Sequence, residues 1–550
     1  MLTSMRIYRM QTTTPRRRGG GAANPRPPPR LALTGTPPAS TRTQRRQNQP
    51  RSARLVVRQT NAWLVNQQQL VNPQRLVAEV KGIYKGIVLV EAKCIEVDST
   101  QEMRKEGDPV PELNNEQWQA LGALHRALLH EHYDFFLASQ HPYASPALTR
   151  LAANYRMPAR MWRHGIHTYL ELLRHRLPQS REHMLTYIYT AYHMMCLLYE
   201  TILSYKETWI ECLGDLGRYR MAIEDNVQDR ETWTEVSRQW YRKASDLSPG
   251  TGRLYHHLAI LAQPNWIQQL LYYSKALCVP NPFDSAREPI LTLFKSFLDE
   301  PGNHPYEAQQ QSIDPPLVRS HACMFMRKDA EKQRAYAEEF LGLLDYHIAR
   351  TARLFLQPAY TIGIANCCAM VEYGSKSNVL LRAIDDEPED EGSGSDEGDG
   401  ESSEQIQQPA AEFFQARDLA CGTARLILDR FGDPNVWPFV HVTLVFVYHL
   451  TFYQEKWAMT RIENSFPWTS LVNLLNTLHR PTSDTKYESA TFPGLLENAG
   501  PPLPEDFAMR GLLWSDRYHP GQWMAEAQVD DDDRGFELAS MAGQRRERIL

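Results

Sequence analysis

The sequence lacks several patterns on which common classes of protein depend. Its eight cysteines form no C-x-x-C pair and have no regular spacing, which favours reduced, buried thiols over a disulfide framework or a zinc module. No uninterrupted run approaches the roughly 20 apolar residues that span a bilayer. The closest run, residues 439–452, is shorter and contains two histidines. We therefore expect a protein of the nucleus, the cytoplasm or both, with no membrane partner.

Signatures of catalysis are also missing from the chain. It contains no G-x-x-x-x-G-K-[ST], no G-x-S-x-G and no H-E-x-x-H. The two histidines of His130-Glu131-His132 are two positions apart, so they face different directions on a helix and do not make a metal site. Asp530 to Asp533 are successive carboxylates on an exposed tail, which do not converge as metal ligands must. We predict that the chain is not an enzyme and uses no cofactor and no metal.

Charge is distributed very unevenly along the chain. The formal net charge of −5 results from 60 Lys+Arg against 65 Asp+Glu. Residues 1–58 hold 13 arginines and no acidic residue, whereas residues 385–404 hold 11 acidic residues and no lysine or arginine. Both segments are poor in apolar residues, so we expect a disordered basic tail and an acidic disordered insertion. The tail is either a patch for RNA, single-stranded DNA or nuclear import, or a solvated segment without a dedicated role.

Beyond the tail, apolar residues recur at three- and four-residue spacing, which is typical of amphipathic helices. Residues 187–203 and 340–354 each form one continuous apolar stripe, and Ser145-Pro146 pairs a cap residue with a first-turn proline. No sustained alternation of apolar and polar residues predicts strands. Residues 436–453 are rich in β-branched and aromatic residues, and we interpret them as a buried helix. The fold class that we expect is all-α.

Residues 233–297 contain a pattern like that of tetratricopeptide (TPR) helical hairpins. In that pattern an aromatic residue precedes an alanine by three positions, and a proline ends the hairpin. Small residues are required where paired helices approach closely. The matching residues are Tyr241, Ala244 and Pro249, then Tyr255, Leu258 and Ala259, then Tyr273, Ala276 and Pro280. Because about one and a half repeats are legible, the pattern predicts a stack of helical hairpins rather than a long solenoid.

Four segments of the sequence resemble the Est/SMG family, which comprises telomerase-associated Est proteins and SMG proteins of nonsense-mediated mRNA decay. They are ECLGDLGRYR, WYRKASDLSPGTGRLYHHLAILA, YYSKALCVPNPFDSAREPI and PPLPEDFAMRGLLW. The resemblance covers roughly residues 60–480, and PPLPEDFAMRGLLW, from Pro501 to Trp514, is a further segment beyond that range. The Pro-Phe-x-x-Ala block at Pro282, Phe283 and Ala286, together with the Arg-Tyr segment, makes it fairly specific.

The resemblance implies a fold, a domain order and a function. The expected order is the basic tail (1–58), a 14-3-3-like helical bundle (59–231), a TPR-like hairpin region containing the acidic insertion (232–480) and a partly disordered C-terminal extension (481–550). It also implies an Est-type DNA/RNA-binding domain. The chain would be a non-catalytic adaptor for a phosphorylated protein partner in mRNA decay or telomere maintenance. The alternative is a protein that binds RNA or DNA directly through the tail, with the helical body as a scaffold.

The resemblance also indicates which residues would bind the phosphate. Arg218 and Tyr219 resemble the Arg-Tyr pair that 14-3-3 folds use, and Arg126 is the best candidate for a basic residue on a facing helix, with Lys93 as an alternative. A phosphate needs a guanidinium fork and further donors from neighbouring helices. The residues themselves leave a second interpretation open, because Arg218 and Arg220 also have the spacing of an ion-pair network with nearby acidic residues. Those acidic residues are Glu211, Asp215, Glu224 and Asp225.

Overall fold

The computed structural model describes residues 73–102, 113–298, 312–385, 409–453, 458–479, 492, 501–519, 523–526, 534 and 537–550. The chain divides into two compact units, residues 1–79 and 80–550, and residues 73–79 of the first form the start of helix α2. The predicted basic tail (1–58), the acidic insertion after Asp385 and the run Asp530 to Asp533 lie outside the described residues.

The described part of the chain is helical throughout and contains no strand, so the all-α prediction is confirmed. Strand-like pairing there is limited to an isolated bridge between Thr251 and Asn281. The first α-helices are α2 (Pro73–Glu102), α3 (Asn115–Ser139), α4 (Pro146–Thr149), α5 (Leu151–Asn154), α6 (Met157–Arg160), α7 (Thr168–His175), α8 (Arg181–Thr201), α9 (Lys206–Ala222) and α10 (Val227–Leu247). A π-helix, η1 (Met161–His167), joins α6 to α7.

The later helices follow in the order of the chain. They are α11 (Gly252–Leu261), α12 (Trp266–Leu277), α13 (Arg287–Leu298), α14 (Asp314–Met326), α15 (Ala330–Thr351), α16 (Leu356–Met370), α17 (Val379–Asp385), α18 (Ala411–Leu428), α19 (Trp437–Thr451), α20 (Trp468–Leu478), α21 (Pro504–Met509), α22 (Trp523–Glu526) and α23 (Met541–Ile549). Short 3-10 turns are η2 (Leu203–Tyr205), η3 (Asp284–Ala286), η4 (Ala352–Phe355), η5 (Pro434–Val436) and η7 (Met459–Arg461). Helix α10 crosses the predicted boundary between residues 231 and 232, and the domain limits remain predictions.

Several helices begin at the polar residues that the sequence places there. The Ser145 hydroxyl accepts a hydrogen bond from the backbone N–H of Leu148, and Pro146 occupies the first turn of α4, as predicted. Asn114 and Gln117 form a reciprocal capping box at the start of α3. Such caps satisfy backbone donors that the first turn of a helix leaves without a partner.

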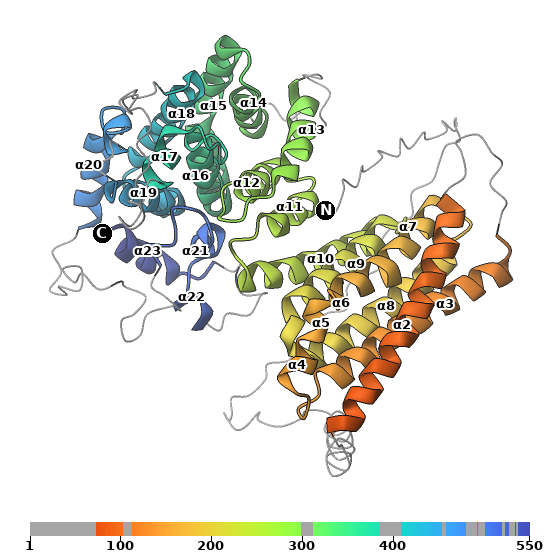
Figure 1. Ribbon diagram of the computed structural model, residues 1–550. Helices are drawn as coiled ribbons and strands as arrows, with labels where there is room; N and C mark the ends of the chain where they lie inside the picture. The colour runs from red at the N-terminus through yellow and green to blue at the C-terminus, as the bar shows by residue number, and fades with distance from the viewer. Residues whose placement is uncertain are drawn as a thin grey trace, which may run out of the picture. The chain divides into compact units, whose positions relative to one another are not determined.

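Helices α8, α9 and α10 pack side by side, as Figure 1 shows. Two glycines of α9 allow the close approach of α10. A Cβ atom at Gly214 would lie 2.9 Å from Cε1 of Tyr241, and one at Gly217 would lie 3.2 Å from the Cβ of Ser237. The glycines of the ECLGDLGRYR segment therefore fix the spacing of two helices, and they set the position of the arginines that follow.

The predicted hairpin pattern corresponds to helices α10, α11 and α12, which pack in that order. Its aromatic and small residues are buried in one core, which includes Tyr241, Ala244, Tyr255, Leu258, Ala259, Tyr273 and Ala276. Gly252 begins α11 at a point where a Cβ atom would lie 2.2 Å from the carbonyl oxygen of Ala276. The sequence pattern thus identified the packed face of these helices correctly.

Further along, α16 is almost entirely buried and packs against α12, α18 and α19. Residues 436–453, expected to form a buried helix despite their β-branched side chains, contain α19, whose residues are mostly buried. Tertiary packing therefore outweighs the strand propensity of those side chains.

The C-terminal residues pack against the hairpin core at several points. The Lys275 ammonium donates to the carbonyl oxygen of Ala508 at 2.7 Å, and the backbone N–H of Leu513 donates to the carbonyl of Cys278 at 3.2 Å. Lys275 is buried, and burial lowers the pKa of its ammonium to about 7. The segment from residue 501 to 519 is thus seated by main-chain hydrogen bonds.

Candidate functional site

Arg218 lies on α9, where its side chain is directed toward α10 and α11. Its Nη2 atom donates to the Asp215 carboxylate at 3.0 Å, and its Nη1 atom donates to Nδ1 of His257 at 3.1 Å. The Tyr241 hydroxyl donates to the same Asp215 oxygen at 2.6 Å. The Arg218 side chain is 14% exposed, so most of its guanidinium is enclosed by these partners.

Tyr219 has a different set of neighbours, because adjacent residues of a helix point about 100° apart. Its hydroxyl donates to the Glu171 carboxylate on α7 at 2.7 Å, and Arg174 donates to the same carboxylate from Nε at 3.1 Å. Burial opposes ionisation of Glu171, but the hydrogen bonds from Arg174 and Tyr219 outweigh it and lower the pKa of the carboxyl. An ionised carboxylate therefore occupies the position between an arginine and a tyrosine.

The other two predicted phosphate ligands lie on earlier helices and reach solvent. Arg126 is exposed on α3. Lys93 is exposed on α2 and pairs with Glu96 at 3.0 Å. Arg218 and Tyr219 bind different partners, and the phosphate-binding role of all four residues remains a prediction.

The ion-pair interpretation of the Arg-Tyr segment agrees with the observed contacts. Besides the Arg218–Asp215 pair, Arg220 lies 2.5 Å from the Glu224 carboxylate. Glu211 pairs with Arg253 at 2.7 Å, and burial raises the pKa of the Glu211 carboxyl to about 7. Because several of these groups are largely enclosed, each depends on its partner, and removing one would leave a buried charge unpaired at the junction of α9, α10 and α11.

Sequence reasoning missed His257 as a partner of Arg218. Burial, followed by the positive charge of Arg218, lowers the pKa of His257 well below its ordinary value, so the imidazole is neutral and can accept the hydrogen bond. His257 lies within the hairpin pattern, but no local spacing connects it with a residue 39 positions earlier.

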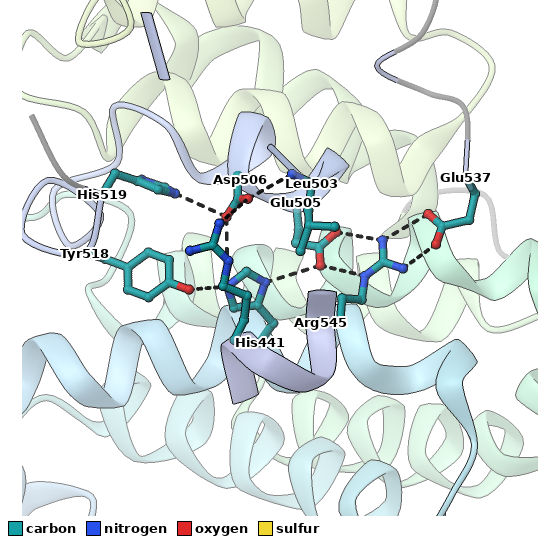
Figure 2. Close-up of polar contacts among 9 residues, drawn as sticks. His441, Leu503, Glu505, Asp506, Tyr518, His519, Glu537 and Arg545 are labelled. Atoms are coloured by element: carbon teal, nitrogen blue, oxygen red, sulfur yellow. Dashed lines mark hydrogen bonds and ion pairs between the residues drawn. The ribbon is translucent and has the colours of Figure 1, made fainter. Parts of the chain in front are cut away.

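A second cluster of charged residues lies where the C-terminal residues meet α19, and Figure 2 shows its contacts. Glu505 accepts two hydrogen bonds from Arg545, at 2.7 and 2.9 Å, and a third contact joins it to Nδ1 of His441 at 3.2 Å. Asp506 accepts from the backbone N–H of Leu503 at 2.9 Å and contacts Nε2 of His519 at 3.2 Å. We call these residues the C-terminal clasp.

The C-terminal clasp is enclosed and its charged groups are partners of one another. Glu505 and Asp506 have no exposed surface, and Arg545 is 1% exposed. All four oxygens of the two carboxylates accept hydrogen bonds. A substrate would find no open position here, so the arrangement suits the attachment of α21 and α23 to the core better than catalysis. The sequence singled out the PPLPEDFAMRGLLW segment but not its buried charges.

The C-terminal clasp predicts an acid-sensitive attachment. In both carboxyls burial opposes ionisation, but bonds from His519 to Asp506 and from His441 and Arg545 to Glu505 outweigh it and lower each pKa. A carboxyl whose pKa is lower in the folded than in the unfolded protein stabilises the fold above its ordinary pKa, and this contribution is lost as the pH falls. The ordinary values are 4.5 for Glu505 and 3.8 for Asp506.

We therefore expect the melting temperature to fall steeply as the pH drops below about 4.5, with the variant Asp506→Asn showing a shallower fall. Thermal unfolding at a series of pH values measures both slopes. Equal slopes for the variant and the native chain would contradict this role of Asp506.

The residues that the structure describes contain no group of three or more His, Cys, Asp or Glu side chains placed to hold a metal ion. Within the same residues, no helix combines the length and apolar character needed to cross a membrane. His130 and His132 contact different carbonyl oxygens of their own helix, those of Arg126 and Leu128.

The fold and the site define an all-α protein of a helical bundle and stacked hairpins, with buried ion-pair networks at the helix junctions. Residues 237–353 match a family model described as the Est1 DNA/RNA binding domain. The chain is 33% identical over 86 residues to Telomerase-binding protein EST1A of Danio rerio, which is 15% of this chain and 5% of that protein. The resemblance to the Est/SMG family is thereby confirmed.

Two further relatives give longer matches at lower identity. Nonsense-mediated mRNA decay factor SMG7 of Danio rerio is 23% identical over 309 residues, which is 55% of this chain and 23% of the relative. EST/SMG-like protein 2 of Saccharomyces cerevisiae is 24% identical over 151 residues, which is 27% of this chain and 12% of the relative. The chain thus spans less than a quarter of the length of each of these relatives.

Proposed function

We propose that the chain is a non-catalytic adaptor of nonsense-mediated mRNA decay or telomere maintenance, in the nucleus, the cytoplasm or both, and that its bundle binds a phosphorylated segment of a protein partner. The observation that carries this proposal is the match to Est/SMG proteins. The names of two relatives refer to telomerase binding and to mRNA decay, which are the two processes proposed.

The bundle offers cations for such a partner. Arg126 is exposed on α3, and a guanidinium fork is suited to a phosphate. Tyr219 supplies a hydroxyl beside Arg174, where the Glu171 carboxylate now accepts the hydrogen bonds that a phosphate oxygen would accept. Arg218 supports the site indirectly, because its enclosed side chain fixes α9 against α10 and α11.

Binding of matched phosphoserine and unmodified peptides from a candidate decay factor tests this proposal. We expect the phosphopeptide to bind more tightly than the unmodified peptide. The variant Arg126→Glu should lower the affinity for the phosphopeptide by roughly 10- to 100-fold, since hydrogen bonds to charged groups are worth about 1.5–3 kcal/mol. Isothermal titration calorimetry measures both affinities. Arg126 is preferable to Arg218 for substitution because it is exposed, so the fold is spared.

The matched control is Arg150→Glu, which makes the same change of charge at another exposed arginine of the bundle. Tyr219→Phe removes one hydroxyl while keeping the aromatic ring, and it tests whether the hydroxyl beside Arg174 contributes to phosphopeptide binding. Equal affinity for the two peptides, or equal losses in Arg126→Glu and Arg150→Glu, would overturn the phosphate site.

A second candidate function is direct binding of RNA or single-stranded DNA. The match of residues 237–353 to a DNA/RNA-binding family model favours it. The arginine-rich tail would add affinity that falls steeply with salt, because neutralising nucleic-acid phosphates releases counterions. Because that match runs from within α10 through α15, we propose the hairpin region as a second contact for the nucleic acid beside the tail.

A further inference from the structure

A small pocket lies where the turn between α14 and α15 meets the turn between α16 and α17. Its volume is about 70 Å³. The residues that matter for its chemistry are Arg287, Phe325, Arg327, Glu372, Tyr373 and Glu412. Three of them, Arg287, Phe325 and Arg327, fall within the residues matched by the Est1 DNA/RNA-binding model.

The backbone on both sides of the pocket has an unusual conformation. Arg327 has a φ angle of 52°, and Glu372 and Tyr373 have φ angles of 47° and 52°. Residues other than glycine rarely adopt this left-handed region, and such positions cluster at binding sites. These left-handed residues end α14 and α16, and they turn two segments that are distant in sequence toward one pocket.

Contacts with these turns hold the two arginines in place. Arg287 donates from Nη2 to the carbonyl oxygen of Tyr373 at 3.2 Å, and its guanidinium lies 5.8 Å from the centre of the Phe325 ring. Arg327 donates from Nη2 to the Glu372 carboxylate at 3.1 Å. Glu372 also accepts from the Asn378 amide at 3.1 Å, so this carboxylate anchors the turn as well as the arginine.

Both guanidiniums keep surface for a ligand. The side chain of Arg287 is 41% exposed and that of Arg327 is 54% exposed. A pair of arginines lining one small pocket is suited to a phosphate, which accepts several hydrogen bonds at once. Glu412 adds an acceptor to the lining, and a carboxylate there can accept from the amino group of a base.

Charged residues of both signs follow Arg327 in the sequence. Lys328 is exposed in the turn, and Lys332 is exposed one helical turn later, 3.7 Å from the Asp329 carboxylate. Because the exposed Asp329 and Glu331 lie between the two lysines, the contact with a nucleic acid depends on Arg287 and Arg327.

We propose that this pocket binds the phosphate of one nucleotide in a single-stranded nucleic acid through Arg287 and Arg327, with Glu412 accepting from an amino group of that nucleotide's base. The proposal rests on the second candidate function above and gives that function a location. A phosphopeptide is the competing ligand, and the family-model match over Arg287 and Arg327 favours the nucleic acid.

Fluorescence anisotropy of the full chain with a short labelled single-stranded RNA, and with DNA of the same sequence, tests the pocket. We expect the double variant Arg287→Gln, Arg327→Gln to bind roughly 10- to 100-fold more weakly, with the slope of log affinity against log salt smaller by about 0.7, because both arginines contact one phosphate. Arg350→Gln, an exposed arginine elsewhere in the matched residues, is the control and should bind like the native chain.

Because the arginine-rich tail also attracts nucleic acid, a second measurement locates the strand. A photoreactive thiouridine RNA should cross-link to the tryptic peptide 320–327, which contains Phe325 and Arg327, and mass spectrometry identifies the site. Cross-links confined to residues 1–58, together with unchanged affinity of the double variant, would overturn the pocket while leaving nucleic-acid binding intact.

Two other outcomes would also overturn the proposal. Failure of the native chain to bind either strand would remove both the pocket and the second candidate function. Loss of phosphopeptide binding in the double variant, with RNA binding unchanged, would assign the pocket to the protein partner instead. A circular-dichroism melt of each variant shows whether the fold is retained, and Arg327→Lys, which keeps the charge, should recover part of the lost affinity.

Discussion

Replacement of Arg545 by methionine is expected to destabilise the attachment of α21 and α23 by about 3–5 kcal/mol, because it leaves buried carboxylates without their main partner. Arg545 is 1% exposed and binds Glu505 through two hydrogen bonds, at 2.7 and 2.9 Å. It also binds Glu537 at 3.0 Å, so one guanidinium joins two carboxylates from separate segments. Urea unfolding, with amide hydrogen exchange of the two helices, measures the loss.

The matched control for this prediction is Arg417→Met. Arg417 pairs with Asp418, whose side chain is 65% exposed, and such pairs contribute about 0–1 kcal/mol. The double variant Arg545→Met, Glu505→Gln removes one of the charges left unpaired, so it should be more stable than Arg545→Met alone. Losses of similar size in the Arg545 and Arg417 variants would show that the C-terminal clasp does not hold these helices.

Most of the helical fold could be predicted from the sequence because the signals are local. The spacing of Tyr241, Tyr255 and Tyr273 identified the buried face of three consecutive helices, and all three rings are buried. The expected helix over residues 436–453 was correct for a similar reason, since its length and context outweighed its β-branched composition.

The partners of individual charged residues could not be predicted in the same way. The spacing in the Arg-Tyr segment allowed both a phosphate ligand and an ion-pair network, and the contact of Arg218 with His257 depends on how α9 packs against α11. Lys275 and Ala508 are 233 positions apart, and Glu505 and Arg545 meet only because both ends of the C-terminal segment return to the core. Such pairs follow from tertiary packing, for which a single sequence contains no local signal.

The C-terminal segment is also fixed by a glycine, and replacing it gives the second large prediction. Gly511 has a φ angle of 81°, and a Cβ atom there would lie 2.1 Å from the carbonyl oxygen of Pro249. The Tyr255 hydroxyl lies 2.8 Å from that same oxygen and 3.3 Å from the carbonyl oxygen of Arg510. It therefore holds the backbone at Pro249 close to the backbone at Arg510. Gly511→Ala should therefore cost about 2–4 kcal/mol, from the left-handed backbone and the clash combined.

Two other glycines separate these contributions. Gly432 has a φ angle of 80° but no atom within 4 Å of a Cβ position, so Gly432→Ala should cost only the backbone penalty of about 1–2 kcal/mol. Gly342 lies inside α15 with open space around it, and Gly342→Ala should stabilise the protein by about 0.5–1 kcal/mol. Chemical unfolding of the three variants measures their free energies of unfolding and so tests the expected order. A loss for Gly511→Ala no larger than that for Gly432→Ala would mean that residue 511 is not seated against Pro249, and the C-terminal segment would then be attached by the C-terminal clasp and by the hydrogen bonds at Ala508 and Leu513.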